Sequence, residues 1–226
     1  MIAIRPPEYW PSPEFTALML RADRMLIGDT FRYSKQSLQH RARLRNPNGW
    51  QWISIPRQRG QRGRAIREVR INTSEPWLGR HWRAFMFNYR SSPYFEYYEP
   101  RLEPLFQKEW KHIGEIAIAT VEFIREVLDV DVEIQPLSQV ENAPDSLAAA
   151  ADLLAGDEIL TLERAAEHDQ EILDSAQVLS LDLPAYDQNF DGFEPGMSVV
   201  DLLFNYGPET RLMLLEHSSI ERLSEI

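Results

Sequence analysis

The stretch that decides the fold is Met1–Asp29, MIAIRPPEYWPSPEFTALMLRADRMLIGD. Its apolar start, Ile2–Ile4, stops at Arg5 and a proline pair, which is typical of a short strand. A helix is predicted from Pro13 to Ala22, with Ser12 as its N-terminal cap. Arg24–Asp29 then reads as a second, buried strand. The chain therefore begins with a strand–helix–strand unit, which is typical of α/β proteins.

Beyond this unit, helical and extended patterns follow one another without an internal repeat, a low-complexity tract or a linker. We expect strands over Trp50–Pro56, Ala65–Asn72, Asp131–Leu137 and Gln177–Leu183. In the first part of the chain we expect a helix near Ser37–Leu44, a helix from a Ser74 cap to Tyr89, helices broken near Pro100 and Pro104, and a helix over Leu105–Leu128. In the second part we expect helices over Asp145–Gly156, Leu162–Leu173, Ser198–Gly207 and Pro208–Leu223. This order predicts a single mixed α/β domain over residues 1–226. A central sheet would carry flanking helices and a helical C-terminal part.

The composition predicts a folded protein in the cytoplasm. Hydrophobic residues make up 43% of the 226 residues, which is enough to build a core. No apolar run approaches the roughly 18 residues that a membrane helix needs, and the N-terminus has no secretion signal. The absence of cysteine excludes disulfides, thiolate nucleophiles and cysteine-ligated metal centres.

Charge is strongly segregated along the chain. Residues 1–113 carry 20 of the 24 basic residues, 10 of the 35 acidic residues and all six tryptophans. Residues 114–226 are correspondingly acidic. The basic, aromatic part is therefore expected to bind an anion, to pack against the acidic part, or to do both.

The stretch Arg57–Arg70 contains six arginines and resembles an RNA-binding arm. Two observations argue against nucleic acid as the partner. The isoelectric point is about 5.0, and the stretch lacks the aromatic residues on which bases stack. We expect a loop over an anionic ligand, or a contact with the acidic part of a second subunit in a homo-oligomer.

Several common sites are absent from the sequence. It has no glycine-rich dinucleotide loop, no phosphate-binding Walker loop and no G-x-S-x-G nucleophile elbow. Its five histidines do not combine with carboxylates at metal-ligand spacing, so no metal site is expected. No cofactor can be named from the sequence.

Five motifs, in order, resemble the WbqC-like family of bacterial proteins, which is associated with O-antigen and related surface polysaccharides. They are PPEYWP from Pro6, the long RADRMLIGDTFRYSKQSLQHRARL from Arg21, WISIP from Trp52, PWLGRHWRAFMFNYRSSPYF from Pro76, and FEPGMSVVDLLFNYGPE from Phe193. The chain departs from the family pattern at five positions: Pro6, Thr30, Arg32, His40 and Ala42.

The resemblance implies transfer of an acyl or aminoacyl group to an amino sugar carried on a nucleotide. The group would pass directly from donor to acceptor, or through a serine or a carboxylate. The alternative is a non-catalytic protein that binds nucleotide sugars or supports assembly, and whose charge segregation drives oligomerisation.

Two residues are candidates for acid–base catalysis. Asp29 follows a predicted strand, at the edge of the sheet where α/β proteins bind ligands, although it could equally cap a turn. His81 lies between two tryptophans and has a side chain that suits proton transfer, although it could simply pack among aromatic rings.

Further residues are candidates for binding an anionic or sugar substrate. Lys35 and Arg41 match the family motif and supply charge for a phosphate. The other candidates lie in or beside the motifs: Tyr9, Arg32, His40, Asn205 and Glu209.

Overall fold

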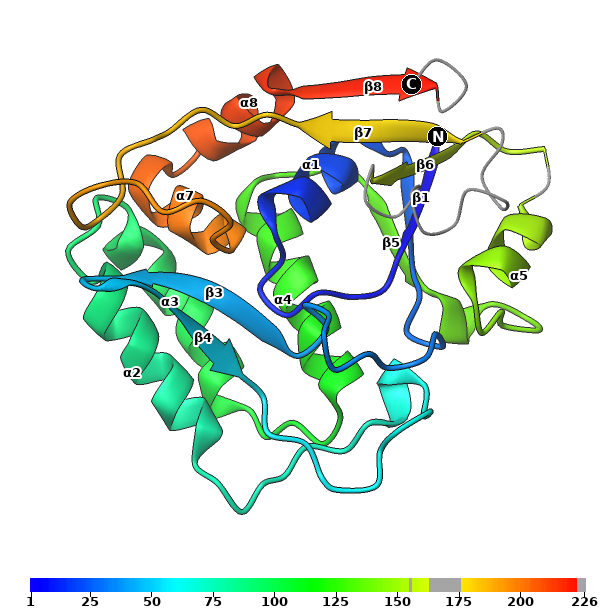
Figure 1. Ribbon diagram of the computed structural model, residues 1–226, viewed down its shortest axis with the longest axis horizontal. Helices are drawn as coiled ribbons and strands as arrows, with labels where there is room; N and C mark the ends of the chain where they lie inside the picture. The colour runs from blue at the N-terminus through cyan, green and yellow to red at the C-terminus, as the bar shows by residue number, and fades with distance from the viewer. Residues whose placement is uncertain (155, 163–175, 223–226) are drawn as a thin grey trace.

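A computed structural model describes residues 1–154, 156–162 and 176–222, and shows a mixed α/β fold (Figure 1). Its centre is a six-stranded sheet in the order β5-β2-β1-β6-β7-β8, in which only β8 runs antiparallel to its neighbour. A separate two-stranded ribbon is formed by β3 and β4. The expected α/β class with a central sheet is confirmed.

The predicted strand–helix–strand unit is present. Strand β1 (Ile2–Arg5) and strand β2 (Arg24–Ile27) pair in parallel, with Ile2 opposite Arg24. Helix α1 (Pro13–Arg21) joins them, and Ser12 caps it by accepting a hydrogen bond from the Phe15 amide. This cap and the proline at the first helical position are the two signals that locate the start of α1 in the sequence.

The other strands of the sheet come from the second half of the chain. They are β5 (Glu133–Pro136), β6 (Ile159–Leu162), β7 (Gln177–Leu181) and β8 (Ser218–Arg222). β5 pairs with β2, whereas β6 pairs with the other side of β1. The first strand therefore lies in the middle of the sheet.

The segment between β2 and β5 holds the ribbon and most of the helices. Its elements are β3 (Arg41–Asn46), β4 (Gly49–Ser54), the short 3-10 helix η1 (Ile66–Glu68), α2 (Trp77–Tyr89), α3 (Phe95–Gln107) and α4 (Ile113–Val127). The ribbon, α2 and α3 lie together at the lower left of Figure 1, away from the sheet strands. Later in the chain come the 3-10 helix η2 (Leu137–Gln139) and helices α5 (Leu147–Leu153), α7 (Val199–Tyr206) and α8 (Glu209–Glu216).

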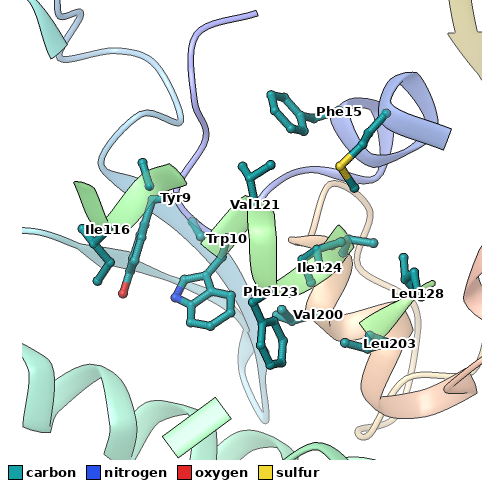
Figure 2. Close-up of a cluster of buried hydrophobic side chains, with 14 of the residues drawn as sticks. Tyr9, Trp10, Phe15, Ile116, Val121, Phe123, Ile124, Leu128, Val200 and Leu203 are labelled. Carbon is teal, nitrogen blue, oxygen red and sulfur yellow. The ribbon is translucent and has the colours of Figure 1, made fainter. Parts of the chain in front are cut away.

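The two faces of the sheet are covered by different helices. The face that carries Ala3 and Met25 belongs to the main core, which also includes side chains of α1, α4 and α7. Figure 2 shows part of this core, where Trp10 and Phe123 lie together. The opposite face packs Ile4 against a smaller cluster that includes Ala150 of α5. Helices on both faces are typical of a doubly wound sheet.

Four local predictions were wrong. Arg41–Asn46 forms a strand where a helix was expected, because Ala42 and Leu44 are buried in alternation. Most of Ala65–Asn72 is a 3-10 turn with isolated bridges. Helix α3 continues through Pro100 and Pro104, which are exposed. After α8 the chain forms β8, where a longer helix was predicted. A fifth prediction, the helix over Leu162–Leu173, lies outside the described residues except for Leu162, which ends β6.

Candidate functional site

The order of the strands creates a crevice beside β1. The chain leaves β1 for β2 on one side and returns through α5 to β6 on the other side. At such a switch point the connections leave the strand ends in opposite directions, and α/β proteins bind ligands at the carboxyl ends of these strands. The sheet topology therefore selects the carboxyl ends of β1 and β6.

A pocket of about 450 Å³ lies at this place, and we call it the switch-point pocket. Its lining comes from the end of β1 and the turn into α1, from a loop after β2, and from the ends of β6 and β7. The residues are Arg5, Pro6, Pro7, Glu8, Ser12, Glu14, Ser37, Leu38, Gln39, Leu162, Leu179, Ser180 and Leu181.

Glu8 is the buried carboxylate of this pocket, with 8% of its surface exposed. Its Oε2 atom accepts hydrogen bonds from the Ser12 amide (2.9 Å) and the Ser12 hydroxyl (2.8 Å). Ser12, at the start of α1, therefore fixes one oxygen of a carboxylate that lines the pocket.

The turn between β1 and α1 holds Glu8 in this position. Trp10 has a left-handed backbone conformation (φ 50°), which is uncommon for a bulky residue. Its amide donates to the Thr120 hydroxyl on α4, and its ring stacks on Phe106 and packs against Phe85. The core therefore stabilises a strained turn directly after the site carboxylate.

The surroundings of Glu8 favour its protonated form. Burial raises the pKa of this carboxyl group above the ordinary value of 4.5. The hydrogen bonds from Ser12 and the positive charge of Arg5 lower the pKa in part, and Glu14 raises it further. A carboxyl group with a raised pKa can exchange a proton near neutral pH more readily than an ordinary glutamate.

The loop Ser34–Gln39 forms the opposite wall of the pocket. Its Leu38 carbonyl accepts a hydrogen bond from the Tyr9 amide, which ties the loop to the turn that carries Glu8. The Gln39 side chain folds back and accepts from the Ser34 amide. This loop therefore contributes polar groups to the pocket lining, whereas other lining residues are apolar, for example Leu162 of β6. This mixture suits a ligand with hydroxyl groups and apolar ring faces.

The two predicted catalytic residues lie elsewhere. Asp29 follows β2 and is buried, and its Oδ1 accepts the Ser138 amide at 2.9 Å. His81 lies on α2, where its Nδ1 is 2.8 Å from the Tyr9 hydroxyl and its ring packs on Trp77. Burial lowers the pKa of His81 to about 4, although a hydrogen bond with the Ser54 backbone opposes this shift. Neither residue lines the switch-point pocket.

Three of the predicted binding residues lie near one another, and two others in the same part of the chain lie apart from them. His40 is buried near Arg41 and Lys35, and this burial, together with their positive charges, lowers its pKa. Tyr9 is fully buried, and Arg32 is exposed beside Ala65. The structure thus brings together Lys35, His40 and Arg41.

The two candidates near the C-terminus are separate from that group. Asn205 is half-buried on α7, where its side-chain amide donates to the Asp201 carbonyl. Glu209 is exposed in the first turn of α8. Neither of them lines the switch-point pocket.

None of the residues that line the switch-point pocket was a candidate from the sequence, and Glu8 and Gln39 are the two on which the site depends most. The sequence holds one signal for Glu8, because it is the only carboxylate of the PPEYWP motif and follows the first strand. Gln39 carries no comparable signal, since its position depends on how the loop folds.

Neither a metal-binding cluster nor a membrane-spanning helix is present in the described part of the chain. Within residues 1–154, 156–162 and 176–222, no three histidine or carboxylate side chains are grouped so as to hold a metal ion. Among the helices of the same residues, none has both the length and the apolar character needed to cross a membrane.

The comparisons with known proteins agree with the motifs. A model described as the WbqC-like protein family matches residues 6–212. The uncharacterized protein Rv1507c of Mycobacterium tuberculosis (strain ATCC 25618 / H37Rv) is 28% identical over 219 residues, covering 92% of this chain and 94% of that protein. No solved structure matches the chain significantly. Because the family model covers most of its length, the chain belongs to the WbqC-like protein family.

Proposed function

We propose that the chain transfers an acyl or aminoacyl group to an amino sugar carried on a nucleotide, in the biosynthesis of surface polysaccharide or a related product. The switch-point pocket would hold the amino sugar. Membership of the WbqC-like family supports the general role that the resemblance implies. The observation that carries the proposal is the position of Glu8, a buried carboxylate that lines this pocket and that Ser12 holds through Oε2.

Glu8 would act as the general base. The sugar amine attacks the carbonyl carbon of the donor, so a carbon–nitrogen bond forms and the bond to the leaving group breaks. Glu8 accepts the proton that the amine loses, and the leaving group departs with its electron pair. The buried position raises the pKa of Glu8, which makes its carboxylate a stronger base than that of an exposed glutamate.

The remaining lining of the pocket fits this substrate class. Ser37, Gln39 and Ser180 offer polar groups for sugar hydroxyls, and Leu38 and Leu181 offer apolar contacts for a ring face or an acyl chain. Direct transfer requires no nucleophile of the protein, which agrees with a chain that has no cysteine. Asp29 and His81 remain predictions, and Glu8 is the better supported base because it lines the pocket whereas they do not.

The test is a turnover assay with the purified chain. Acyl thioesters and aminoacyl donors are each combined with a panel of nucleotide-linked amino sugars, and mass spectrometry detects the added acyl group. We expect Glu8→Gln to lower turnover by about 100-fold or more, as for other general bases. Glu96→Gln, which changes an exposed carboxylate on α3, should leave turnover unchanged.

Two outcomes would contradict the proposal. If Asp29→Asn or His81→Gln abolished turnover and Glu8→Gln did not, the chemistry would lie at the positions predicted from the sequence. If nucleotide sugars raised the melting temperature but no donor gave a product, the chain would be a non-catalytic binding protein.

A further inference from the structure

A cluster of positive charge lies beside the switch-point pocket. Tyr33 and His40 pack edge to face, with ring centroids 5.4 Å apart, and the Arg57 guanidinium lies 5.8 Å from the centre of the Tyr33 ring. Burial and the nearby positive charges of Arg41, Arg57 and Lys35 lower the pKa of His40 to about 4. We call Lys35, Arg41 and Arg57, with the two rings between them, the basic cluster.

No carboxylate of the described residues forms an ion pair with this cluster. The ion pairs among the described residues do not include Lys35, Arg41 or Arg57. This is notable because the chain has 35 acidic against 24 basic residues. Cations held close together without a counterion repel one another, so the cluster is complementary to an anion from outside the chain.

His40 supplies an independent sign of a missing partner. The residue is 8% exposed, yet its buried Nδ1 atom has no hydrogen-bond partner among the described residues. A buried polar atom without a partner costs free energy, and such atoms are rare in folded proteins. A bound group within reach of this nitrogen would remove that cost.

Arg41 is held ready for a ligand. Its guanidinium lies 4.3 Å from the centre of the Trp52 ring, and one Nη2 donates to the Gln36 carbonyl at 2.7 Å. A guanidinium stacked on an aromatic face keeps the N–H groups at its edge free to donate, and its fixed orientation reduces the entropy lost on binding. Its Nε atom is buried and also has no partner among the described residues.

The basic cluster and the pocket share one segment of the chain. Ser37, Leu38 and Gln39 line the pocket, and Tyr33 and His40 lie on either side of that loop. A single elongated ligand could therefore contact both places.

We propose that Lys35, Arg41 and Arg57, together with His40 and Tyr33, bind the diphosphate of a nucleotide-linked substrate. The identity of the ligand rests on the proposed function, because the sugar end would occupy the switch-point pocket. Arginine forks match the oxygen atoms of phosphate, and the lysine adds a mobile charge. Tyr33 and neutral His40 add hydrogen-bond groups at the centre of the cluster.

The test measures binding of inorganic pyrophosphate by isothermal titration calorimetry at low ionic strength. We expect Arg41→Gln and Arg57→Gln each to weaken binding by about tenfold or more, as expected for a charged hydrogen bond. Arg59→Gln and Arg62→Gln are matched controls, because both arginines are exposed on the same loop as Arg57, and they should change the affinity less than about threefold.

A second readout follows the His40 ring by NMR. An anion bound between the three cations should raise the pKa of His40, whose neighbours are otherwise Tyr33 and positive charges. A merely structural role of the arginines would not produce this shift when pyrophosphate is added.

Three results would overturn the proposal. They are the absence of pyrophosphate binding, equal losses in the control variants, and equal affinity for malonate, which would indicate a carboxylate ligand. Tighter binding of an RNA oligonucleotide than of pyrophosphate would likewise assign the cluster to nucleic acid.

The outcome is separable from that of the turnover assay. Glu8→Gln should abolish transfer and leave pyrophosphate binding intact. If pyrophosphate binds but no acyl donor is used, the phosphate subsite stands and the proposed reaction fails.

Discussion

Oε2 of Glu8 accepts hydrogen bonds from both the amide and the hydroxyl of Ser12, at 2.9 and 2.8 Å. The same Ser12 hydroxyl oxygen accepts from the Phe15 amide at 3.2 Å. The cap of α1 and the proposed base therefore belong to one hydrogen-bond network. A substitution of Ser12 or Glu8 therefore affects both the start of α1 and the pocket. Comparing variants at the two positions separates the effect on helix stability from the effect on the pocket.

Ser12→Ala should destabilise the fold more than Glu8→Gln does. The alanine removes the cap of α1 and one donor to Glu8, which we expect to cost about 1–2 kcal/mol. The glutamine can retain both bonds, because a single amide oxygen can accept from both groups of Ser12. Unfolding in urea measures the difference.

Ser146→Ala provides the matched control for this comparison. Ser146 caps α5 by accepting the Ala149 amide, but it is exposed and holds no buried carboxylate. Its loss should cost less than that of Ser12. Equal losses for the two serines would mean that the link to Glu8 contributes nothing to stability.

Glu8 should make stability fall as pH rises. Burial raises its pKa above 4.5, so the folded state retains a proton that the unfolded state has already lost. Below pH 4.5 both states are protonated and there is no penalty. As the pH rises from 4.5 through the raised pKa, the wild type should lose stability relative to Glu8→Gln, by about 1.4 kcal/mol for each unit of the shift. Urea unfolding of both proteins at pH 4 and 7 tests this, and an unchanged difference would contradict it.

His81 should have the opposite effect on stability. Its pKa falls from 6.5 to about 4, mainly through burial, so the folded state keeps the ring neutral. This stability is fully present above pH 6.5 and is lost as the pH falls from 6.5 towards 4, in total about 3 kcal/mol. NMR should show that the ring does not titrate above pH 5. A midpoint near 6.5 would show that the ring is solvated, in conflict with its contacts to Tyr9 and Trp77.

The sequence was sufficient for the elements whose signals are local. Ser12 and Pro13 identified the start of α1, and Ser198 and Gly207 identified the limits of α7. The apolar stripe that ends at Leu128 located the end of α4, although the helix begins at Ile113 and not at Leu105 as predicted. Each of these signals depends on caps or on periodicity within one segment, so no knowledge of the tertiary structure was needed.

The elements that were missed depend on contacts between distant segments. Strand β8 (Ser218–Arg222) is largely polar and forms at the sheet edge because it pairs with β7. Strand β6 has four residues and is stabilised between β1 and β7. The pocket likewise depends on distant segments, since Glu8 becomes a pocket residue only when β6 pairs with β1 and β7 pairs with β6. A sequence pattern alone does not contain that arrangement.

Asp201, a residue of the last family motif, should be essential for the stability of the fold. It is fully buried on α7, and its Oδ2 accepts from the Tyr186 hydroxyl and the Gln188 amide, each at 2.8 Å. Asp201→Ala removes the acceptor of the half-buried Tyr186 hydroxyl and leaves the Gln188 amide with the Glu194 carbonyl, which should cost about 1–3 kcal/mol. In a double-mutant cycle with Tyr186→Phe, we expect a coupling energy of about 1 kcal/mol or more in urea unfolding. Strict additivity would show that the two side chains do not interact energetically.

Gly207 should tolerate no side chain. The residue ends α7 with φ 56° and ψ −127°, a backbone conformation that L-residues rarely adopt. A Cβ atom added here would lie 2.5 Å from the Tyr94 ring, so Gly207→Ala combines backbone strain with a steric clash. We expect a loss of about 3 kcal/mol or more in the free energy of unfolding. Gly60→Ala is the matched control, because Gly60 also has a positive φ (73°) but nothing lies within 4 Å of the added atom. The control should lower the free energy of unfolding by about 1–2 kcal/mol. Equal losses in the two variants would mean that Tyr94 moves aside and that its contact is not the reason for glycine at the end of α7.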